Sequence, residues 1–527
     1  MPLQKNQVLT LRVERLSSDG SGVAHSPDGE TVFIPGAAPG DEARVRIVKD
    51  CKRYAFGILD EVLTPSPDRI PVDCAVAGPC GGCSLRHLDY AAELRAKQEN
   101  VADAFARIGG LDVPVLPIVG SPEVNRYRNK VQFPVGVDKS GKPCIGFYAG
   151  RTHRIVPCPD CRLQPGVLNE IGNALCAFFA EKGIQPYSEE TGRGLVRHIF
   201  LRRGAHSGQI MVCLVCTRAK LPSAEELCTR LKAQFAEITT ILLNVNAKNT
   251  NVILGTETHT LYGPGYIEDT LCGVPVQLGP LSFYQVNTLA AEQLYGIAAQ
   301  YAQLTPDDLL LDLYCGMGTI GLSMAAHCRE LIGVEIVPEA IESAKANAAR
   351  MGADVAAKSR FFCADAGQAA TRLAAEGLHP DIVMLDPPRK GCDEATLSAV
   401  VRMSPRRVVY VSCNPATAAR DAAWLEQNGY HAEKVQPVDL FPRTRHCEAV
   451  LLLSKLNVDR HIEVEVSMDE LDVTAAESKA TYNEIREHVW EHHQLKVSNL
   501  YIAQVKQKYG IIERENYNKA KNENAKQ

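Results

Sequence analysis

The sequence predicts a multidomain α/β protein whose C-terminal half contains a doubly wound, mostly parallel β-sheet. From about residue 306, apolar runs alternate with helical segments, which is typical of strands buried on both faces of a parallel sheet. Residues 7–62 instead show short alternating runs separated by Gly, Pro and Asp, which are typical of a small β-barrel. The chain has 527 residues. Single cores stop growing at roughly 250 to 300 residues, so several domains are expected.

Composition and charge narrow the class of protein. Hydrophobic residues make up 45% of the chain and charged residues 23%, which is ordinary for a globular protein. The formal net charge of −5 excludes a uniformly basic nucleic-acid binder but leaves local basic patches open. The N-terminus lacks the apolar run of a signal peptide, and no stretch approaches the roughly 20 apolar residues of a membrane span. We therefore expect a soluble, cytoplasmic monomer without membrane contact, whose 18 cysteines are free thiols, metal ligands or nucleophiles.

Residues 1–62 are predicted to form the barrel. The runs "VLTLRVERL", "TVFIPG", "EARVRIVKD" and "FGILDEVL" are short strand patterns separated by turn-forming residues. A Pro-, Gly- and Cys-rich stretch follows, and then the helical pattern "YAAELRAKQENVADAFARIGG", which stops at a Gly pair. This helix, near residues 89–110, is expected to pack on the domain that begins at residue 271.

Residues 63–270 are predicted to form an α+β domain. Strand patterns such as "GQIMVCLVCT" and "ITTILLNVN" are mixed with the helical pattern "GVLNEIGNALCAFFAEKG". The first of these contains Cys213 and Cys216. Residues three apart in a strand face opposite sides, so this Cys-x-x-Cys pair is not expected to chelate a metal.

A basic segment lies inside this domain, between Arg126 and Arg162. It contains eight Lys or Arg residues against two acids, a local balance of +6, with Tyr and Phe residues between them. Such a segment offers cations to phosphates and rings to bases. The alternative is a solvated hairpin edge protected by its charges, and the residues alone favour neither.

Residues 271–455 contain the predicted parallel sheet. Its first strand ends in "DLYCGMGTIGL", where Gly316, Gly318 and Gly321 form a Gly-x-Gly-x-x-Gly loop between a strand and a helix, and Glu335 ends the next strand. Such a loop lets backbone amides approach a nucleotide-like ligand, and the acid can accept hydrogen bonds from ribose hydroxyls. The motif alone does not separate NAD from S-adenosylmethionine.

Two further strands end in reactive side chains, at "IVMLDPPRKG" (Asp386) and "VVYVSCNP" (Cys413). Ligands of open α/β sheets bind outside the carboxyl ends of the strands, so these groups and the glycine loop are expected to share one crevice. A strand end holds a nucleophilic thiol rigidly, and Arg389 and Lys390 could favour its thiolate. The alternative is that Cys413 is one more small buried hydrophobic residue.

A second group of cysteines, Cys74, Cys80 and Cys83, lies in the Gly- and Pro-rich stretch with C-x5-C-x2-C spacing. Three thiols need a fourth to close a metal site, and either Cys158 or Cys161 in "VPCPDCRLQ" could supply it. The spacing leaves tetrahedral zinc and an iron-sulfur cluster both open.

Taken in order, "YQVN", "DLYCGMGTIGL", "DPPRKG", "SCNP" and "HCEAVLLL" resemble the motifs of the S-adenosylmethionine-dependent RNA uracil-5-methyltransferases. The resemblance spans about residues 5–455 and implies a Rossmann-like methyltransferase domain over residues 271–455. It implies that Cys413 is the nucleophile that adds to the uracil ring and that Glu448 is the base that removes the ring hydrogen. The cofactor and active-site positions that it implies are Gln285, Tyr314, Gly316, Gly318, Thr319, Glu335, Asp365 and Asp386, with Thr319 standing where the family carries Asn.

The resemblance also implies a [4Fe-4S] cluster and an RNA-binding TRAM barrel, which belong to the ribosomal branch of this family. Its fourth cluster ligand precedes a "-x-L" sequence, which favours Cys161 beside Cys74, Cys80 and Cys83; Cys158 stays the alternative. The implied substrate is therefore 23S ribosomal RNA. The residues expected to contact RNA are Arg126, Arg128, Lys130 and Phe283.

Three alternatives stay open on sequence grounds. They are the same chemistry on a tRNA uridine, a noncatalytic RNA-binding ribosome-assembly factor, and an NAD-dependent oxidoreductase. The tail over residues 456–527 lies outside the resemblance. Its pattern predicts two or three amphipathic helices with a turn near Leu495, of unknown role.

Overall fold

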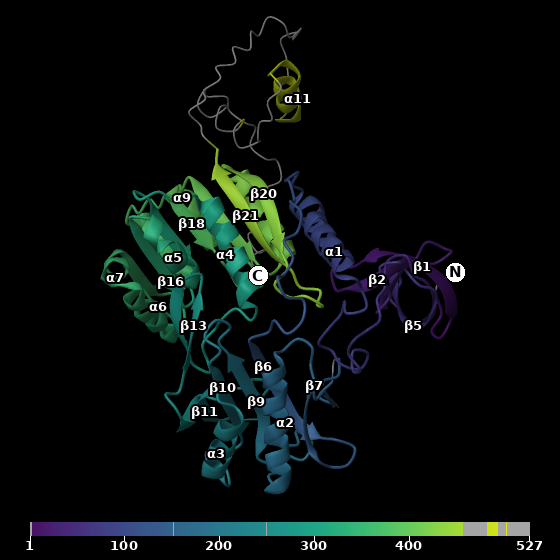
Figure 1. Ribbon diagram of the computed structural model, residues 1–527. Helices are drawn as coiled ribbons and strands as arrows, with labels where there is room; N and C mark the ends of the chain where they lie inside the picture. Colours follow the sequence, from purple (N-terminus) through teal and green to yellow (C-terminus); the bar gives the residue numbers. More distant parts are fainter. Residues whose placement is uncertain (1–2, 151, 249, 457–481, 494–501, 503–527) are drawn as a thin grey trace, which may run out of the picture. The chain divides into compact units, whose positions relative to one another are not determined.

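The computed structural model describes residues 3–150, 152–248, 250–456, 482–493 and 502 (Figure 1). The chain forms two compact units, Met1–Ala423 with Ala432–Lys455, and Trp424–His431 with Leu456–Gln527. In the second unit the described part includes α11 (Tyr482–His493), inside the predicted helical tail. The predicted turn near Leu495 lies outside the described residues.

The first unit begins with a closed barrel, which confirms the predicted fold of the N-terminal region. Its strands are β1 (Val8–Leu16), β2 (Ser21–His25), β3 (Thr31–Pro35), β4 (Glu42–Asp50) and β5 (Tyr54–Thr64). They are joined in the order β1-β2-β3-β5-β4 around the barrel. Buried and exposed residues alternate along β4 because one face fills the barrel and the other meets solvent.

A connecting helix follows, α1 (Tyr90–Asp103), extended by a π-helical turn over Ala104–Gly109. The Asp89 side chain caps its first turn, accepting from the N–H of Ala91 at 3.1 Å. At its end Gly110 has a φ of 63°, the left-handed conformation that commonly stops a helix. The helix therefore ends at the predicted Gly pair.

The central region is an α+β layer, as predicted. Its sheet has the order β12-β11-β10-β9-β6-β7-β8. The strands are β6 (Lys130–Val137), β7 (Pro143–Tyr148), β8 (Ile155–Pro157), β9 (Val196–Arg203), β10 (Ile210–Cys216), β11 (Ile238–Val245) and β12 (Glu257–Tyr262), with α2 (Gly166–Glu181) and α3 (Ala224–Gln234). On β10, Cys213 and Cys216 belong to different hydrophobic clusters, which confirms that they face opposite sides.

A hairpin and a helix lead into the last sheet: β13 (Ile267–Leu271), β14 (Val274–Leu278) and α4 (Thr288–Ala302). That sheet has the order β17-β16-β15-β18-β19-β21-β20. Its strands are β15 (Leu309–Leu313), β16 (Glu330–Glu335), β17 (Ser359–Cys363), β18 (Ile382–Leu385), β19 (Arg407–Ser412), β20 (Tyr430–Val438) and β21 (Glu448–Lys455).

Strands β15 to β19 are parallel, and helices flank the sheet as in doubly wound folds (Figure 1). The helices are α5 (Thr319–Met324), a 3₁₀ turn (Ala325–His327), α6 (Pro338–Met351), α7 (Ala353–Lys358), α8 (Ala366–Ala375), α9 (Glu394–Met403) and α10 (Pro415–Gln427). The predicted Rossmann-like sheet is therefore confirmed, and the carboxyl ends of its parallel strands share one edge.

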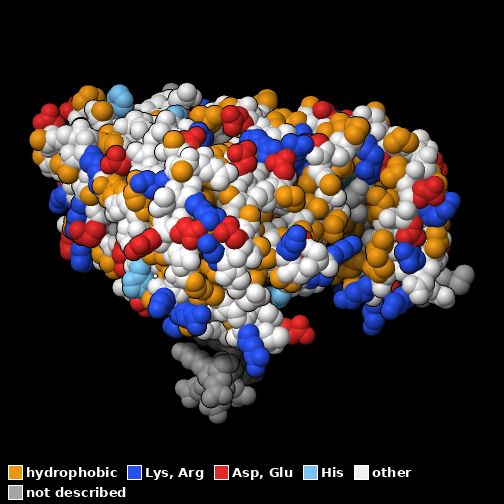
Figure 2. All heavy atoms as spheres, turned by 60° about the horizontal axis from the view of Figure 1, so that its bottom comes forward, with side chains coloured by type: hydrophobic (Ala, Val, Ile, Leu, Met, Phe, Trp, Pro, Cys, Tyr) orange, Lys and Arg blue, Asp and Glu red, His pale blue; other side chains and the backbone are white. Residues whose placement is uncertain are grey.

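In the described part of the chain, no helix is both long and apolar enough to cross a membrane. Lys and Arg side chains form separate groups among acidic and apolar ones on the face shown in Figure 2. This distribution agrees with the formal net charge of −5, which still allows local basic patches.

Candidate active site

The loop between β15 and α5 forms a cradle at the carboxyl edge of the parallel sheet. Tyr314, Gly316 and Gly318 have φ angles of 67°, 56° and 80°, so the backbone turns sharply here. Glu335 ends the neighbouring strand, and its carboxylate accepts hydrogen bonds from the backbone N–H of Gly316 (3.2 Å) and of Val337 (2.9 Å). The predicted glycine loop and the predicted acid are thus joined at one site.

Other predicted cofactor residues meet around the buried Tyr295 of α4. Its hydroxyl lies 3.3 Å from the Thr319 hydroxyl and also hydrogen-bonds the Gln285 side chain. Burial raises the pKa of Tyr295, and the nearby Asp386 carboxylate raises it further. Asp365 lies just after β17. Its side chain caps α8, where it accepts a hydrogen bond from the N–H of Gln368 at 3.1 Å.

Cys413 directly follows the last residue of β19, and Glu448 begins the adjacent antiparallel strand β21. The register of β19 and β21 pairs Arg407 with Ser454 and Ser412 with Ala449. Cys413 and Glu448 are the next residues beyond the Ser412–Ala449 pair, and the charge of Glu448 acts on the Cys413 thiol.

The site concentrates carboxyl groups in a buried environment. Burial and the charge of Asp386 raise the pKa of Glu448 to about 8, and burial raises the pKa of Asp386 to about 7. Burial also raises the pKa of Asp312, in the middle of β15, to about 8. These carboxyl groups can therefore exchange protons near neutral pH, which general acid–base chemistry requires.

Cys413 has opposing electrostatic neighbours. Its half-buried position raises the pKa of the thiol, and the charges of Glu448 and Asp386 raise it further. The Arg389 side chain opposes this rise by its charge and a hydrogen bond, and its charge also lowers the pKa of Glu448. Arg389 is therefore a cation that favours the thiolate.

A loop over residues 439–447, called the 439–447 loop below, carries the chain from β20 to Glu448. Four consecutive carbonyl groups of this loop accept hydrogen bonds from distant segments. The pairs are Leu440 with Asn287 Nδ2 (3.1 Å), Phe441 with Lys97 Nζ (3.2 Å), Pro442 with the Tyr127 hydroxyl (3.0 Å), and Arg443 with the N–H groups of Ser84 (3.0 Å) and Leu85 (3.1 Å).

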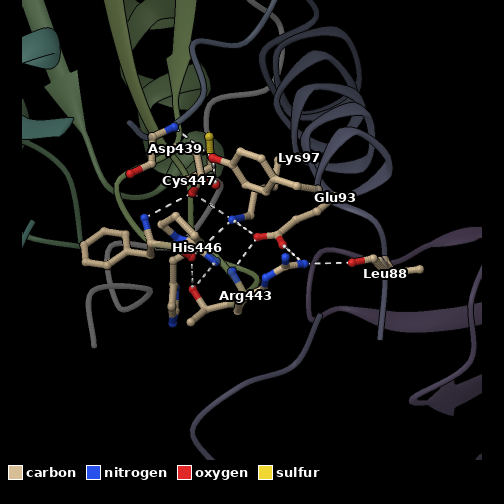
Figure 3. Close-up of polar contacts among 12 residues, drawn as sticks. Leu88, Glu93, Lys97, Asp439, Arg443, His446 and Cys447 are labelled. Carbon is tan, nitrogen blue, oxygen red and sulfur yellow. Dashed lines mark hydrogen bonds and ion pairs between the residues drawn. The ribbon is translucent and has the colours of Figure 1, made fainter. Parts of the chain in front are cut away.

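Buried charges strengthen the same attachment, as the close-up in Figure 3 shows. Lys97 of α1 donates to Glu93 (2.7 Å) and Asp439 (2.8 Å), and all three side chains are fully buried. The N–H of Arg443 donates to Glu93 at 2.7 Å, and its guanidinium donates to the carbonyl of Leu88 at 2.7 Å. Helix α1 thereby fixes the loop that leads to Glu448.

A cavity of about 110 Å³ brings together Cys74, Cys80, Cys83, Cys158 and Cys161 with Arg86 and Arg128. In the described part of the chain, no group of three or more His, Cys, Asp or Glu residues is arranged to hold a metal ion. The five thiols thus surround one space without converging on the single point that one ion requires. Cys158 and Cys161 also hydrogen-bond each other, so the two candidate fourth ligands lie side by side.

The residues predicted to contact RNA have different surroundings. Arg126 is bound to Asp160 (2.7 Å) and to the carbonyls of Cys161 and Gln164, so its guanidinium is used inside the protein. Lys130 has no ion pair in the part of the chain that the structure describes. Burial, Arg202 and Arg128 lower its pKa to about 8.

The Phe283 side chain is 71% exposed. Its loop is held in place by Arg202, which donates to the carbonyls of Gly279 (2.9 Å) and Ser282 (2.7 Å). An exposed ring on an anchored loop can contact a ligand without first being ordered.

The sequence analysis did not identify three residues that lie near the glycine loop and the parallel sheet. Ile336 follows Glu335 directly and is 61% exposed, an apolar surface beside the glycine loop. Asp312 Oδ1 is buried without a hydrogen-bond partner, and Tyr295 links several site residues. An acid inside the apolar run "LLLDLYCG" was an available signal for Asp312, whereas Tyr295 has none in the sequence.

Comparison with known proteins agrees with this geometry. The tRNA (uracil-5-)-methyltransferase family matches residues 207–456, and the TRAM domain matches residues 2–59. An uncharacterized RNA methyltransferase of Halalkalibacterium halodurans is 43% identical over 457 residues, 86% of this chain and 99% of that protein. One of Listeria monocytogenes is 42% identical over 455 residues, 86% of this chain and 98% of that protein.

Among solved structures, the Pyrococcus abyssi tRNA (uracil-54, C5)-methyltransferase in complex with S-adenosyl-L-homocysteine has a TM-score of 0.67. It is 26% identical and covers 85% of this chain and 100% of its own. The two family models together cover the barrel, the glycine loop, Cys413 and Glu448. The chain therefore belongs to the S-adenosylmethionine-dependent RNA (uracil-5-)-methyltransferase family and carries an N-terminal TRAM domain.

Proposed function

We propose that this protein transfers a methyl group to carbon 5 of a uridine in 23S ribosomal RNA through a covalent bond between Cys413 and the uracil. The observation that carries the proposal is that Cys413 and Glu448 lie at the adjacent ends of β19 and β21, where the charge of Glu448 acts on the thiol. The reaction needs one nucleophile and one base close together, and this pair supplies both.

The chemistry of uracil explains why a thiol is needed. Carbon 5 is too weak a nucleophile to take a methyl group unaided. When the Cys413 thiolate adds to carbon 6, the electron pair of the C5–C6 double bond shifts toward carbon 5 and the adjacent carbonyl, which makes carbon 5 an enolate carbon. Bound S-adenosylmethionine supplies the methyl group in an electrophilic form.

Release of the product needs a base. The Glu448 carboxylate takes the proton from carbon 5, the electrons of that C–H bond re-form the C5–C6 double bond, and the bond to sulfur breaks with its pair on Cys413. One methyl cation enters the ring and one proton leaves it. Arg389 favours the thiolate both before addition and as the leaving group.

The residues of the glycine loop fit a nucleoside ligand. Gly316 and Gly318 have the positive φ angles of a tight glycine turn, Glu335 lies beside this turn as a candidate acceptor for ribose hydroxyls, and the exposed Ile336 offers an apolar face to an adenine ring.

Ribosomal RNA is the proposed substrate because the barrel and the cysteine cavity occur together. Within the family that this chain resembles, that combination belongs to the ribosomal branch. Lys130 and Arg128 lie close together without a neutralising carboxylate, which suits RNA phosphates. The exposed Phe283 suits stacking on a base that has been turned out of its helix.

A tRNA uridine is the second candidate. The observation in its favour is the structure of the Pyrococcus abyssi tRNA (uracil-54, C5)-methyltransferase, which aligns over all of its own length. The similarity covers 85% of this chain, so it includes most of the first 455 residues. The barrel alone therefore does not decide between the two RNAs.

We further propose a [4Fe-4S] cluster in the cysteine cavity, held by Cys74, Cys80, Cys83 and Cys161. Thiols arranged around a space, rather than at one point, fit a cluster better than a single ion. Ser84 and Leu85, which follow Cys83 directly, hold the carbonyl of Arg443. The cluster would thus stabilise the attachment of the 439–447 loop, since methyl transfer needs no electron.

The experiment that tests the substrate is transfer of radiolabelled methyl from S-adenosylmethionine to unmodified 23S RNA and to tRNA transcripts. Label recovered as 5-methyluridine in 23S RNA supports the proposal, and mapping it gives the position. Label in tRNA alone overturns the substrate and favours the second candidate. Binding of both RNAs without label in either, by protein purified without oxygen, favours a noncatalytic assembly factor.

A further inference from the structure

A turn over residues 389–392, called the Arg389 turn below, is bound to the start of helix α10. The carbonyl of Arg389 accepts hydrogen bonds from Asn414 Nδ2 (3.0 Å) and from the Thr417 hydroxyl (3.4 Å). Cys413 immediately precedes Asn414 in the chain. The segment that begins just after the thiol therefore holds the backbone of the residue whose charge acts on that thiol.

Asp421 lies farther along the same helix, and its side chain is 1% exposed. Its Oδ2 accepts hydrogen bonds from the N–H of Cys392 (2.8 Å) and from the Tyr410 hydroxyl (2.6 Å). Its Oδ1 accepts one from Arg420 Nε (2.8 Å), and Arg420 Nη2 donates to the carbonyls of Lys390 (3.0 Å) and Cys392 (3.3 Å). One buried carboxylate thus joins β19, α10 and the Arg389 turn.

Gly391 shows how closely the Arg389 turn fits against the helix. Its φ of 79° is in the left-handed region that favours glycine. A methyl group added there would lie 2.5 Å from Arg420 Nη2 and 2.6 Å from Asp421 Oδ2. Both distances are shorter than van der Waals contact, so a residue without a side chain is needed between the turn and the helix.

The proposed reaction does not use the Asp421 carboxylate, but the contacts of Asp421 lead to Arg389. The Arg389 side chain is exposed, so the position of its guanidinium depends on where its backbone is held. Glu448, Asp386 and Arg389 are the charged groups that act on the Cys413 thiol, and Arg389 is the one among them that favours the thiolate. If Arg389 moved away, the two carboxylates would act on the thiol unopposed.

We propose that Asp421 is a positioning residue for the nucleophile: it holds the Arg389 turn against α10 and thereby keeps the Arg389 guanidinium beside the Cys413 thiol. The inference rests on the proposed function, since it takes Cys413 as the nucleophile. Loss of Asp421 is expected to free the turn, so that the guanidinium leaves the thiol and the thiolate fraction at neutral pH falls.

Alkylation of Cys413 by iodoacetamide tests this effect in the full-length protein. Trypsin releases Cys413 in a peptide of residues 408–420 that contains no other cysteine, so mass spectrometry follows this thiol alone. The thiolate is the reactive form, so the pH dependence of the alkylation rate gives the pKa of the thiol. Asp421→Ala should raise that pKa by about half a unit or more, which lowers the rate at neutral pH about threefold or more.

The sign of this shift separates positioning from a direct effect of charge. Removing a negative charge near a thiol lowers the pKa of the thiol, so a rise on loss of Asp421 must act through another group. Arg389→Gln should raise the pKa of Cys413 by itself, and Asp421→Ala should then add nothing measurable, since the two residues act as one unit. An equal rise with and without Arg389 would overturn the inference.

Asp308→Ala is the matched control. Asp308 is also a buried carboxylate paired with an arginine, Arg406, at 2.5 Å. It directly precedes β15, at the amino end of the parallel strands, whereas Cys413 follows the carboxyl end of β19. Asp308→Ala should therefore leave the alkylation of Cys413 unchanged, and a rise equal to that of Asp421→Ala would identify a general loss of stability instead of positioning.

Gly391→Ala tests the same contact without removing a charge, and it guards against failure of Asp421→Ala to fold. Its methyl group would displace the Arg389 turn from α10, so the pKa of Cys413 should again rise. A folded Asp421→Ala or Gly391→Ala that keeps the wild-type pKa at Cys413 would overturn the inference. The assay contains neither RNA nor methyl donor, so its result is independent of which RNA the protein methylates.

Discussion

Lys97 donates a hydrogen bond of 2.8 Å to Asp439, a residue 342 positions later in the chain. Both side chains are almost completely buried, and Glu93 shares the same ammonium group. Buried charges are tolerated when they are paired and hydrogen-bonded, as here. The ion pairs therefore join α1 to the 439–447 loop, which ends at the proposed base.

Lys97→Met is predicted to destabilise the protein by about 3–5 kcal/mol, because removing one partner of a buried ion pair leaves uncompensated charge. Denaturant unfolding measures this loss. Lys345→Met is the control: Lys345 pairs with Glu342 on an exposed helix surface, and its loss should change stability by less than about 1 kcal/mol. Equal effects of the two substitutions would contradict a supporting role for Lys97.

Glu448→Gln is predicted to trap the covalent adduct. Glutamine keeps the shape of the side chain but cannot take the proton from carbon 5, so the Cys413–uracil bond persists after methyl transfer. A denaturing gel should show a protein–RNA band that disappears in the double variant Cys413→Ala/Glu448→Gln. Glu342→Gln, a change at an exposed acid, should turn over normally without such a band. Full turnover by Glu448→Gln would exclude Glu448 as the base.

The rate of methyl transfer at saturating RNA and S-adenosylmethionine is predicted to rise from about pH 6 to about pH 9. Burial raises the pKa of Cys413, and the thiolate fraction grows as pH rises toward it. Burial raises the pKa of Glu448 to about 8, and the carboxylate needed as base likewise forms as pH rises through that value. Single-turnover rates over this range measure the trend, and a rate that falls with rising pH would contradict these roles.

Cys161→Ser is predicted to lose bound iron and visible absorbance, whereas Cys158→Ser retains them. Iron analysis of protein purified without oxygen measures both. Cys144→Ser, outside the cysteine cavity, is the control. Loss of iron from Cys158→Ser alone would identify Cys158 as the fourth ligand, and a wild-type protein without iron would exclude the cluster.

Local patterns predicted the barrel and the parallel sheet. Alternation and strand–helix order are properties of neighbouring residues, so they can be read without tertiary information. The opposite faces of Cys213 and Cys216 followed from the two-residue period of a strand. The positive φ angles of Gly316 and Gly318 likewise agree with the predicted glycine loop.

Contacts between distant segments could not be predicted this way. Nothing near Lys97 indicates Asp439, and only the family resemblance pointed to Glu448, because the register of β21 against β19 depends on the whole sheet. Arg126 was expected to contact RNA, yet its guanidinium binds Asp160 and two carbonyls, a partner choice that charge counting does not reveal.

The most direct test of covalent catalysis compares Cys413→Ala with Cys363→Ala in single-turnover methyl transfer to the RNA that the wild type labels. Cys363 is exposed at the end of β17, on the same sheet edge, where the strand register places it beside Glu335 and not beside Glu448. We predict that Cys413→Ala forms no 5-methyluridine above background while Cys363→Ala keeps the wild-type rate. Substantial methyl transfer by a folded Cys413→Ala that still binds RNA would contradict the proposed mechanism.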